Sequence, residues 1–349
     1  MPSQPKFKWI AALAAAAALL ALPAAAQATL AFTRNPLHPL VFAANDNGSH
    51  AHKVGPGRSP KVSPDGLSIA YLREGPGHAQ ELALAPAAGG PTRTLMVGWQ
   101  DSFSLAFSPD SKTIAALRGG ELGKRKLVLI DVATGAQSFV ASGYFSGFSF
   151  SPDGTELTYA KAGSEKYPPR SDVYRFGIPI GESLRFVPPV RITDDHSSED
   201  PLWGPTGKIV FVRLIDAQKR KYGPKNELYL MNPDGSGVKR LTRTKVDPLL
   251  QGLSPTQWSA NGQRLLTEFG GQDTTYAVTV NPKTGAEKTL TKEREVGFVG
   301  TALSADGSTV LGDTGGFEPG PDHKVVTIPY TGGKPKVLAK NASEPSWNR

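Results

Sequence analysis

The densest group of side chains able to do acid–base or metal chemistry lies between residues 194 and 200. It contains Asp194, Asp195, His196, Glu199 and Asp200. Carboxylates and an imidazole at this spacing can hold a cation or transfer protons if the fold turns them toward one point. A solvated loop in which Asp200 caps a turn explains the same residues and is the interpretation that the sequence favours. We therefore keep the first three as candidates for a binding surface only.

The remaining patterns give little sign of catalysis. His50 and His52 have the spacing of two side chains on one face of a strand, which could bind one ion, but the other histidines form no cluster with them. No Gly-x-Ser-x-Gly elbow, phosphate-binding loop or dinucleotide fingerprint occurs. We expect no metal, no cofactor and no serine hydrolase.

Positive charge is concentrated in three segments. Segments 118–126, 161–171 and 213–225 together carry more formal charge than the +8 of the whole chain. A focused basic surface attracts acidic partners and speeds their encounter, whereas the simpler explanation is that lysine and arginine keep long loops hydrated. The candidate residues here are Arg118, Lys124, Arg125, Lys219, Arg220 and Lys221.

A third set of candidates combines exposed aromatic and polar side chains in segments that should enter the first strand of successive repeats. Aromatic groups beside convergent polar groups are typical of a recognition rim. The candidates are Trp99, Asp101, Tyr144 and Arg294.

The elements that position these residues follow from an internal repeat. The turn Ser-Pro-Asp-Gly occurs at 63–66 and 151–154, with variants at 108, 204, 259 and 304, at intervals of 43 to 55 residues. Proline presets a type I turn, aspartate favours the next position, and glycine accepts the positive φ that closes a hairpin. Apolar residues precede each copy and a short β-run follows it. Two further strands per unit complete the four-stranded blade of a propeller.

The two ends of the chain complete one blade between them. Residues 29–32 resemble a second strand without a first, and residues 344–347, ending in Trp347, resemble a first strand without a second. Their pairing would close the ring and leave no unpaired sheet edge. Residues 29–349 give about 46 residues per blade for seven blades and about 54 for six. We predict an all-β, seven-bladed β-propeller, with six blades as the alternative.

The repeat units resemble those of TolB-like β-propellers. The resemblance rests on the Ser-Pro-Asp-Gly turns and on segments such as 228–237, Leu-Tyr-Leu-Met-Asn-Pro-Asp-Gly-Ser-Gly, followed by Arg-Leu-Thr. It covers nearly all of residues 29–349 and implies a bacterial envelope or extracellular protein-binding module. The pattern departs from the founding members, which carry six blades and a preceding α/β domain. Similar repeats occur in propellers fused to peptidases and in some polysaccharide lyases.

Residues 1–28 have the three parts of a secretory signal peptide. Lys6 and Lys8 precede an apolar run over residues 10–22, and Ala26-Gln27-Ala28 has the form of a cleavage site. The sequence contains no cysteine, so burial and sheet hydrogen bonds must hold the fold without disulfides. We expect a periplasmic or extracellular monomer with no membrane span.

In such a propeller the loops after the second and fourth strands emerge on one face, where binding residues concentrate. We therefore expect an exported, non-catalytic module that docks a protein or an anionic glycan or envelope polymer, and no nucleic acid, through this loop face. A lyase or hydrolase with its site at the channel mouth is the alternative. Convergence of Tyr144, Asp195 and His196 on one cavity would favour the enzyme.

Overall fold

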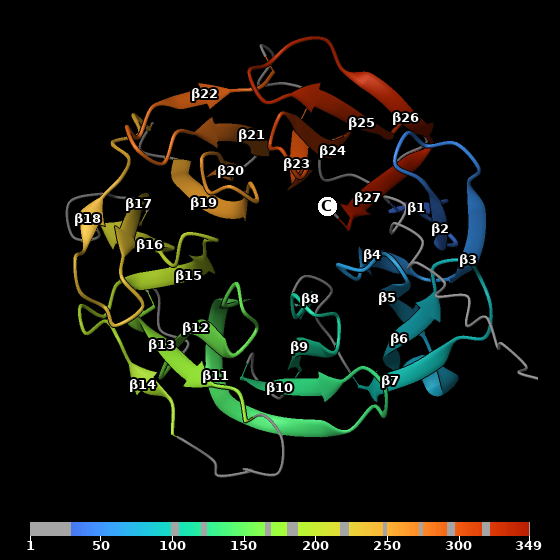
Figure 1. Ribbon diagram of the computed structural model, residues 1–349, viewed down its shortest axis with the longest axis horizontal. Coiled ribbons are helices and arrows are strands. Elements are labelled where there is room, and N and C mark those ends of the chain that lie inside the picture. The colour runs from blue at the N-terminus through green and yellow to red at the C-terminus, as the bar shows by residue number, and fades with distance from the viewer. Residues whose placement is uncertain are drawn as a thin grey trace, which may run out of the picture.

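The computed structural model describes residues 29–98, 105–119, 124–164, 169–179, 188–216, 223–246, 250–271, 275–291, 297–315 and 322–348. Within these residues the strands form seven four-stranded blades around a central axis, the first strand of each blade innermost (Figure 1). The prediction of an all-β propeller with seven blades is confirmed, and the six-bladed alternative is wrong.

The first three blades come from the ends and the first third of the chain. Blade 1 comprises β27 (Ala342–Trp347), β1 (Thr29–Arg34), β2 (Leu40–Asn45) and β3 (His52–Pro56). Blade 2 comprises β4 (Arg58–Val62), β5 (Ser68–Glu74), β6 (Gln80–Pro86) and β7 (Arg93–Val97), with the short 3₁₀ turn η1 (Pro76–His78) between β5 and β6. Blade 3 comprises β8 (Leu105–Phe107), β9 (Thr113–Arg118), β10 (Arg125–Asp131) and the first half of β11 (Gln137–Phe150).

The other four blades follow in chain order. Blade 4 comprises the second half of β11, β12 (Glu156–Ala162), β13 (Ser171–Gly177) and β14 (Val190–Arg191). Blade 5 comprises β15 (Ser198–Trp203), β16 (Ile209–Ile215), β17 (Lys225–Met231) and β18 (Lys239–Arg240). Blade 6 comprises β19 (Leu250–Trp258), β20 (Leu265–Gly271), β21 (Thr275–Val280) and β22 (Glu287–Thr289). Blade 7 comprises β23 (Phe298–Leu303), β24 (Thr309–Thr314), β25 (Lys324–Pro329) and β26 (Lys336–Lys340).

The ring is closed by the two ends of the chain, as predicted. Strand β27 runs antiparallel to β1, with Leu30 opposite Trp347 and Ala31 opposite Ser346. The Thr29 N–H also donates to the Asn348 side-chain oxygen at 2.8 Å. In Figure 1 the red end of the chain lies beside the blue beginning.

The repeated turns have the local structure that their residues dictate. In blade 3 the Ser108 hydroxyl donates to Asp110 at 2.6 Å, the Lys112 N–H donates to the same carboxylate, and the Ser108 oxygen accepts the Thr113 N–H. Equivalent bonds occur at the turns beginning at 63, 151, 259 and 304. These bonds lower the pKa of Asp110 and of Asp153, and they lower that of Asp306 to about 2. The turn carboxylates are therefore structural.

One predicted loop is instead part of a strand. Strand β11 continues without interruption from blade 3 into blade 4: its first half pairs with β10 and its second half with β12. Tyr144 was predicted in a loop on the binding face, but it lies within this strand, opposite Ala162. The prediction is wrong because the backbone of residues 137–150 stays extended through Gly143 and Gly147, pairing first with β10 and then with β12.

The hydrophobic core lies between the faces of adjacent blades. The central residues of the second strand of each blade are buried on both faces, as at Phe32, Tyr71, Tyr159 and Phe211. This arrangement fixes the sheets rigidly, so only the loops and the innermost strands present side chains to the channel and its two mouths. Among the described residues, no helix has the length and apolar character that a membrane span requires.

Candidate functional site

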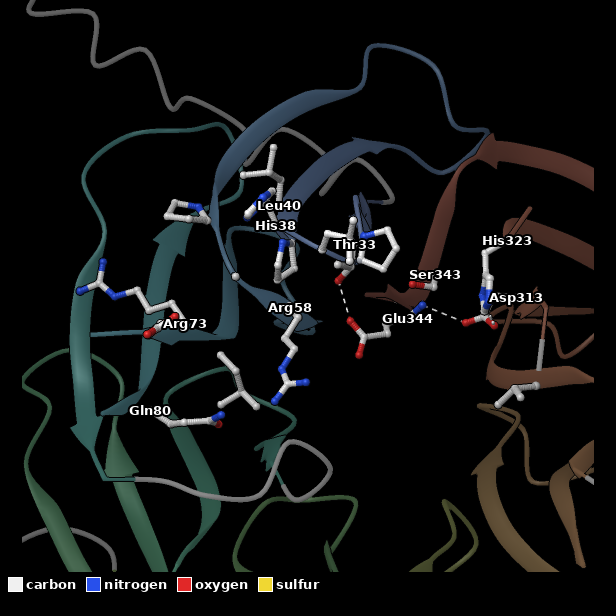
Figure 2. Close-up of a pocket in the computed structure, with 18 of the residues that line it drawn as sticks. Thr33, His38, Leu40, Arg58, Arg73, Gln80, Asp313, His323, Ser343 and Glu344 are labelled. Carbon is white, nitrogen blue, oxygen red and sulfur yellow. Dashed lines mark hydrogen bonds and ion pairs between the residues drawn. The ribbon is translucent and has the colours of Figure 1, made fainter. Parts of the chain in front are cut away.

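A cavity opens where the loops after the second and fourth strands surround the channel mouth. It has a volume of about 1110 Å³ and lies mainly against blades 1 and 2, with its far wall from blades 6 and 7. Its walls include the β1–β2 loop, the β3–β4 link and the β5–β6 loop. This mouth pocket, shown in Figure 2, lies on the face that the sequence predicted to be the binding face.

Three of the innermost strands share an irregularity, and one of its residues, Glu344, lines this pocket. In β4, β15 and β27 the pairing register shifts at a residue that precedes proline: Ser59, Asp200 and Glu344. Their φ values are 53°, 45° and 53°, a left-handed conformation that costs a non-glycine residue roughly 1–2 kcal/mol. Strain of this kind persists only where surrounding bonds hold it in place.

The carboxylate of Glu344 supplies such bonds. It accepts hydrogen bonds from the Thr33 hydroxyl at 2.7 Å and from both the N–H and the hydroxyl of Ser59 at 2.8 Å. The Glu344 N–H donates to Asp313 at 2.8 Å. One side chain therefore joins blade 1 to blade 2, and its backbone joins blade 1 to blade 7, across the closure of the ring.

Among the described carboxyl groups that line the mouth pocket, Asp313 has the largest shift in pKa. Burial raises its pKa to about 6, and the Glu344 carboxylate adds to the rise, while the Glu344 N–H and His323 oppose it. The His323 Nδ1 lies 4.0 Å from an Asp313 oxygen. Burial also raises the pKa of Glu268, on the wall from blade 6.

A second acidic group lies in the channel at blade 5. Burial raises the pKa of Asp200 to about 7, and the carboxylates of Glu199 and Glu268 raise it further, against a hydrogen bond with Ser254. A Cβ on Gly147 of the preceding blade would come within 3.1 Å of Asp200, so the two strands approach closely there. The interpretation of Asp200 as a solvated turn cap is wrong, because the register shift in β15 turns this residue inward.

Two arginines line the mouth pocket: the guanidinium of Arg73 forms an ion pair, whereas that of Arg58 is available for a ligand. Arg73 pairs with Glu81 at 2.8 Å and donates to Thr94. The Thr94 hydroxyl in turn donates to the Glu81 carboxylate, and this bond, with a smaller influence from Arg73, lowers the pKa of Glu81. Arg58 makes no hydrogen bond or ion pair through its side chain with any residue that the structure describes. Figure 2 shows its guanidinium extending into the open centre of the pocket.

The rim of the pocket carries an exposed apolar group. Leu37, in the β1–β2 loop, is 86% exposed, the largest value among the large hydrophobic residues that the structure describes as exposed. His38 follows it on the same wall. The same cavity is therefore lined by an apolar side chain in water and by an available cation, two groups that suit a protein partner.

The acidic segment 194–200 does not form one site with Tyr144. The His196 Nδ1 lies 2.8 Å from a carboxylate oxygen of Asp172. The Asp195 carboxylate instead accepts from Ser198 and pairs with Arg213. Asp194 is exposed. The convergence that would have favoured an enzyme at these residues is not found.

The basic candidates are divided between surface and structure. Arg118 and Lys124 are exposed at the end of blade 3, and Arg125 is partly buried. Lys161 lies over the Tyr174 ring, and burial, with a smaller influence from Lys124, lowers its pKa. Six candidates lie outside the described residues: Trp99, Asp101, Lys219, Arg220, Lys221 and Arg294.

The two spaced histidines have separate partners. The His52 Nε2 lies 2.9 Å from the Ala87 carbonyl oxygen, and the His50 Nδ1 contacts Asn45 and Ser49. Over the described ranges, no group of three or more His, Asp or Glu side chains has a geometry able to hold a metal ion.

Comparison with known proteins identifies the architecture. No protein-family model and no curated protein sequence matches the chain. TolB from Acinetobacter baumannii superimposes with a TM-score of 0.54 at 18% identity, over 91% of this chain and 81% of that one. The fold is that of TolB-like β-propellers.

Two enzymes share this architecture. An oligogalacturonate lyase solved with manganese gives a TM-score of 0.58 at 17% identity, covering 91% of this chain and 86% of that one. A puromycin-hydrolysing peptidase from Mycobacterium tuberculosis gives 0.61 at 17% identity, covering 91% of this chain and 54% of that one. Because the TolB-like fold is found in TolB, a lyase and a peptidase, the fold alone does not decide the function.

Sequence reasoning pointed to the face on which the mouth pocket opens, but not to the residues of this pocket. It did not single out Leu37, Arg58, Asp313 or Glu344. The sequence did contain a signal for two of them, because both lie at an x-Pro pair in a first strand. Arg58 directly precedes the pair 59–60, and Glu344 is the first residue of the pair 344–345. A proline inside a strand marks a bulge, where a side chain is redirected.

Proposed function

We propose that this protein is an exported, non-catalytic binding module that docks a partner protein in its mouth pocket. The proposal rests on one observation above all: the available guanidinium of Arg58 and the exposed side chain of Leu37 line the same cavity of about 1110 Å³ on the loop face. Arginine is a typical anchor of protein interfaces, and covering exposed apolar surface such as that of Leu37 favours association. A partner segment with a carboxylate beside an apolar side chain would match both anchors.

The acids of the pocket support binding more than catalysis. Glu344 already accepts three hydrogen bonds, and Asp313 accepts a fourth from the Glu344 backbone. A general base needs a lone pair within reach of the proton that it removes, and these oxygens are committed to holding the ring closed. The basic residues of blades 3 to 5 then serve to steer an acidic partner toward the face.

An enzyme acting at the channel mouth is the second candidate, and Asp313 is the observation that favours it. A carboxyl group with a pKa of about 6 is suited to proton transfer near neutral pH. Under this alternative Asp313→Asn abolishes turnover, whereas under the binding proposal the same variant keeps its partner.

Site-specific photocrosslinking tests the proposal in cells that export the protein. A photoreactive side chain at position 37 should give a discrete adduct with a partner protein. The same group at Leu67, which is 68% exposed in a turn at the opposite end of the channel, is the matched control and should give none. Introducing Arg58→Glu should remove the adduct at position 37, because the charge that holds the partner's carboxylate is reversed.

Two results would contradict the binding proposal. One is an adduct of equal yield from positions 37 and 67. The other is an adduct at position 37 that Arg58→Glu leaves unchanged.

A further inference from the structure

A second cavity lies at the other end of the central channel. It has a volume of about 240 Å³ and is lined by the last residues of the innermost strands β4, β8, β19, β23 and β27. Because these strands run from the loop face toward the Ser-Pro-Asp-Gly turns, this channel cavity opens on the face opposite the mouth pocket. Typical pockets for drug-sized ligands are roughly 300–1,000 Å³, so any occupant of this cavity is small.

The charged group of the channel cavity is Lys61. Burial lowers the pKa of its ammonium group, and the Glu344 carboxylate opposes this from a distance greater than that of an ion pair. Among the residues that the structure describes, Lys61 has no hydrogen bond or ion pair through its side chain. A desolvated cation without a paired anion is costly, so the site favours whatever anion can reach it.

The other polar groups around Lys61 are hydrogen-bond donors or can act as donors. The Ser346 oxygen accepts the Val62 N–H at 3.1 Å, which leaves the Ser346 hydroxyl proton for another acceptor. Thr256 presents a second hydroxyl from β19. No carboxylate is found among the described residues that line the cavity. Trp347 and Phe107 add apolar walls.

We propose that the channel cavity binds a small ligand through an oxyanion group, a carboxylate or a phosphate, held by the Lys61 ammonium. The hydroxyls of Ser346 and Thr256 complete the donor set, and the aromatic walls cover the rest of the ligand. This site is separate from the mouth pocket and does not depend on the proposed partner.

Isothermal titration calorimetry at constant ionic strength tests this site with three probes: inorganic phosphate, acetate and glucuronate. At least one probe should bind saturably to the wild-type protein, and Lys61→Gln should weaken that binding by tenfold or more. Lys112→Gln, which removes an exposed lysine from a turn on the same face, is the matched control and should bind as the wild type does. Comparison of phosphate with the two carboxylates identifies which oxyanion the site prefers.

A second readout shows whether Lys61 itself is covered. Competitive labelling with acetic anhydride should modify Lys61 at a lower pH than exposed lysines, and the bound probe should protect it. Thermal unfolding of Lys61→Gln should remain cooperative, with a midpoint no lower than that of the wild type, because the variant removes a desolvated charge. Saturable binding that Lys61→Gln leaves unchanged, or no saturable binding of any probe, would overturn the proposal.

Discussion

Replacing Glu344 by alanine should lower the free energy of unfolding by about 3–4 kcal/mol. A hydrogen bond to a charged group is worth about 1.5–3 kcal/mol, and a buried donor left without its acceptor costs about 1–3 kcal/mol. Glu344 accepts three such bonds, and the lost acceptor leaves the Ser59 N–H unsatisfied at the junction of blades 1 and 2. Urea denaturation followed by tryptophan fluorescence measures the change.

The matched comparison for this variant is Glu74→Ala. Glu74 also lines the mouth pocket, but its side chain is exposed, and among the residues that the structure describes it pairs only with an exposed histidine, His78. Its loss should change the free energy of unfolding by less than about 0.5 kcal/mol. A loss under 1 kcal/mol for Glu344→Ala would show that the ring closure does not depend on this carboxylate.

Replacing Asp200 by asparagine should stabilise the protein at pH 8 by about 2–4 kcal/mol. The pKa of Asp200 is about 7 in the folded chain against an ordinary value of 3.8, and each unit corresponds to about 1.4 kcal/mol. A raised folded-state pKa contributes stability fully below about pH 4, and this contribution is lost as the pH rises through about 7. Asparagine keeps the shape, can still bond to Ser254, and carries no charge beside Glu199 and Glu268.

The pH dependence distinguishes this effect from a general gain in stability. The difference between Asp200→Asn and the wild type should be near zero at pH 4 and largest at pH 8. Asp306→Asn is the control, because Asn261 fills the equivalent turn position in blade 6 and the hydrogen bonds of the turn hold the pKa of Asp306 below its ordinary value. Guanidinium denaturation at a series of pH values measures both. A difference that is constant with pH would contradict the burial of Asp200.

The fold was predictable because the sequence patterns that determine its turns and strands are short and recur along the chain. A turn such as 108–113 is fixed by hydrogen bonds between residues at most five apart, so a pattern of four consecutive residues is enough to predict it. The closure was predictable for a related reason: Trp347 and Leu30 lie in segments that copy neighbouring first and second strands. The residue count then favoured seven blades.

The site was less predictable because its geometry depends on contacts across the whole chain. The Ser59 N–H and the Glu344 carboxylate are separated by 285 residues, and no local sequence pattern predicts the hydrogen bond between them. Asp200 was assigned to a solvated loop because its neighbours are polar, whereas a register shift in β15 turns it into the channel. Counting the charges of loop segments drew attention to Arg118 and Lys124. It missed Arg58, an isolated cation in the sequence whose side chain lines the mouth pocket.

The most direct test of the account is the affinity of the partner captured through position 37 for two charge-reversed proteins. We predict that Arg58→Glu weakens binding by about 30-fold, or about 2 kcal/mol, because it removes an anchor inside the mouth pocket. The rim variant, a double change of the exposed blade 3 residues Arg118→Glu and Lys124→Glu outside the pocket, should lower the association rate mainly at low salt. It should weaken binding by less than about threefold at 0.15 M salt. A larger loss of affinity for the rim variant than for Arg58→Glu would contradict the assignment of the mouth pocket as the docking site.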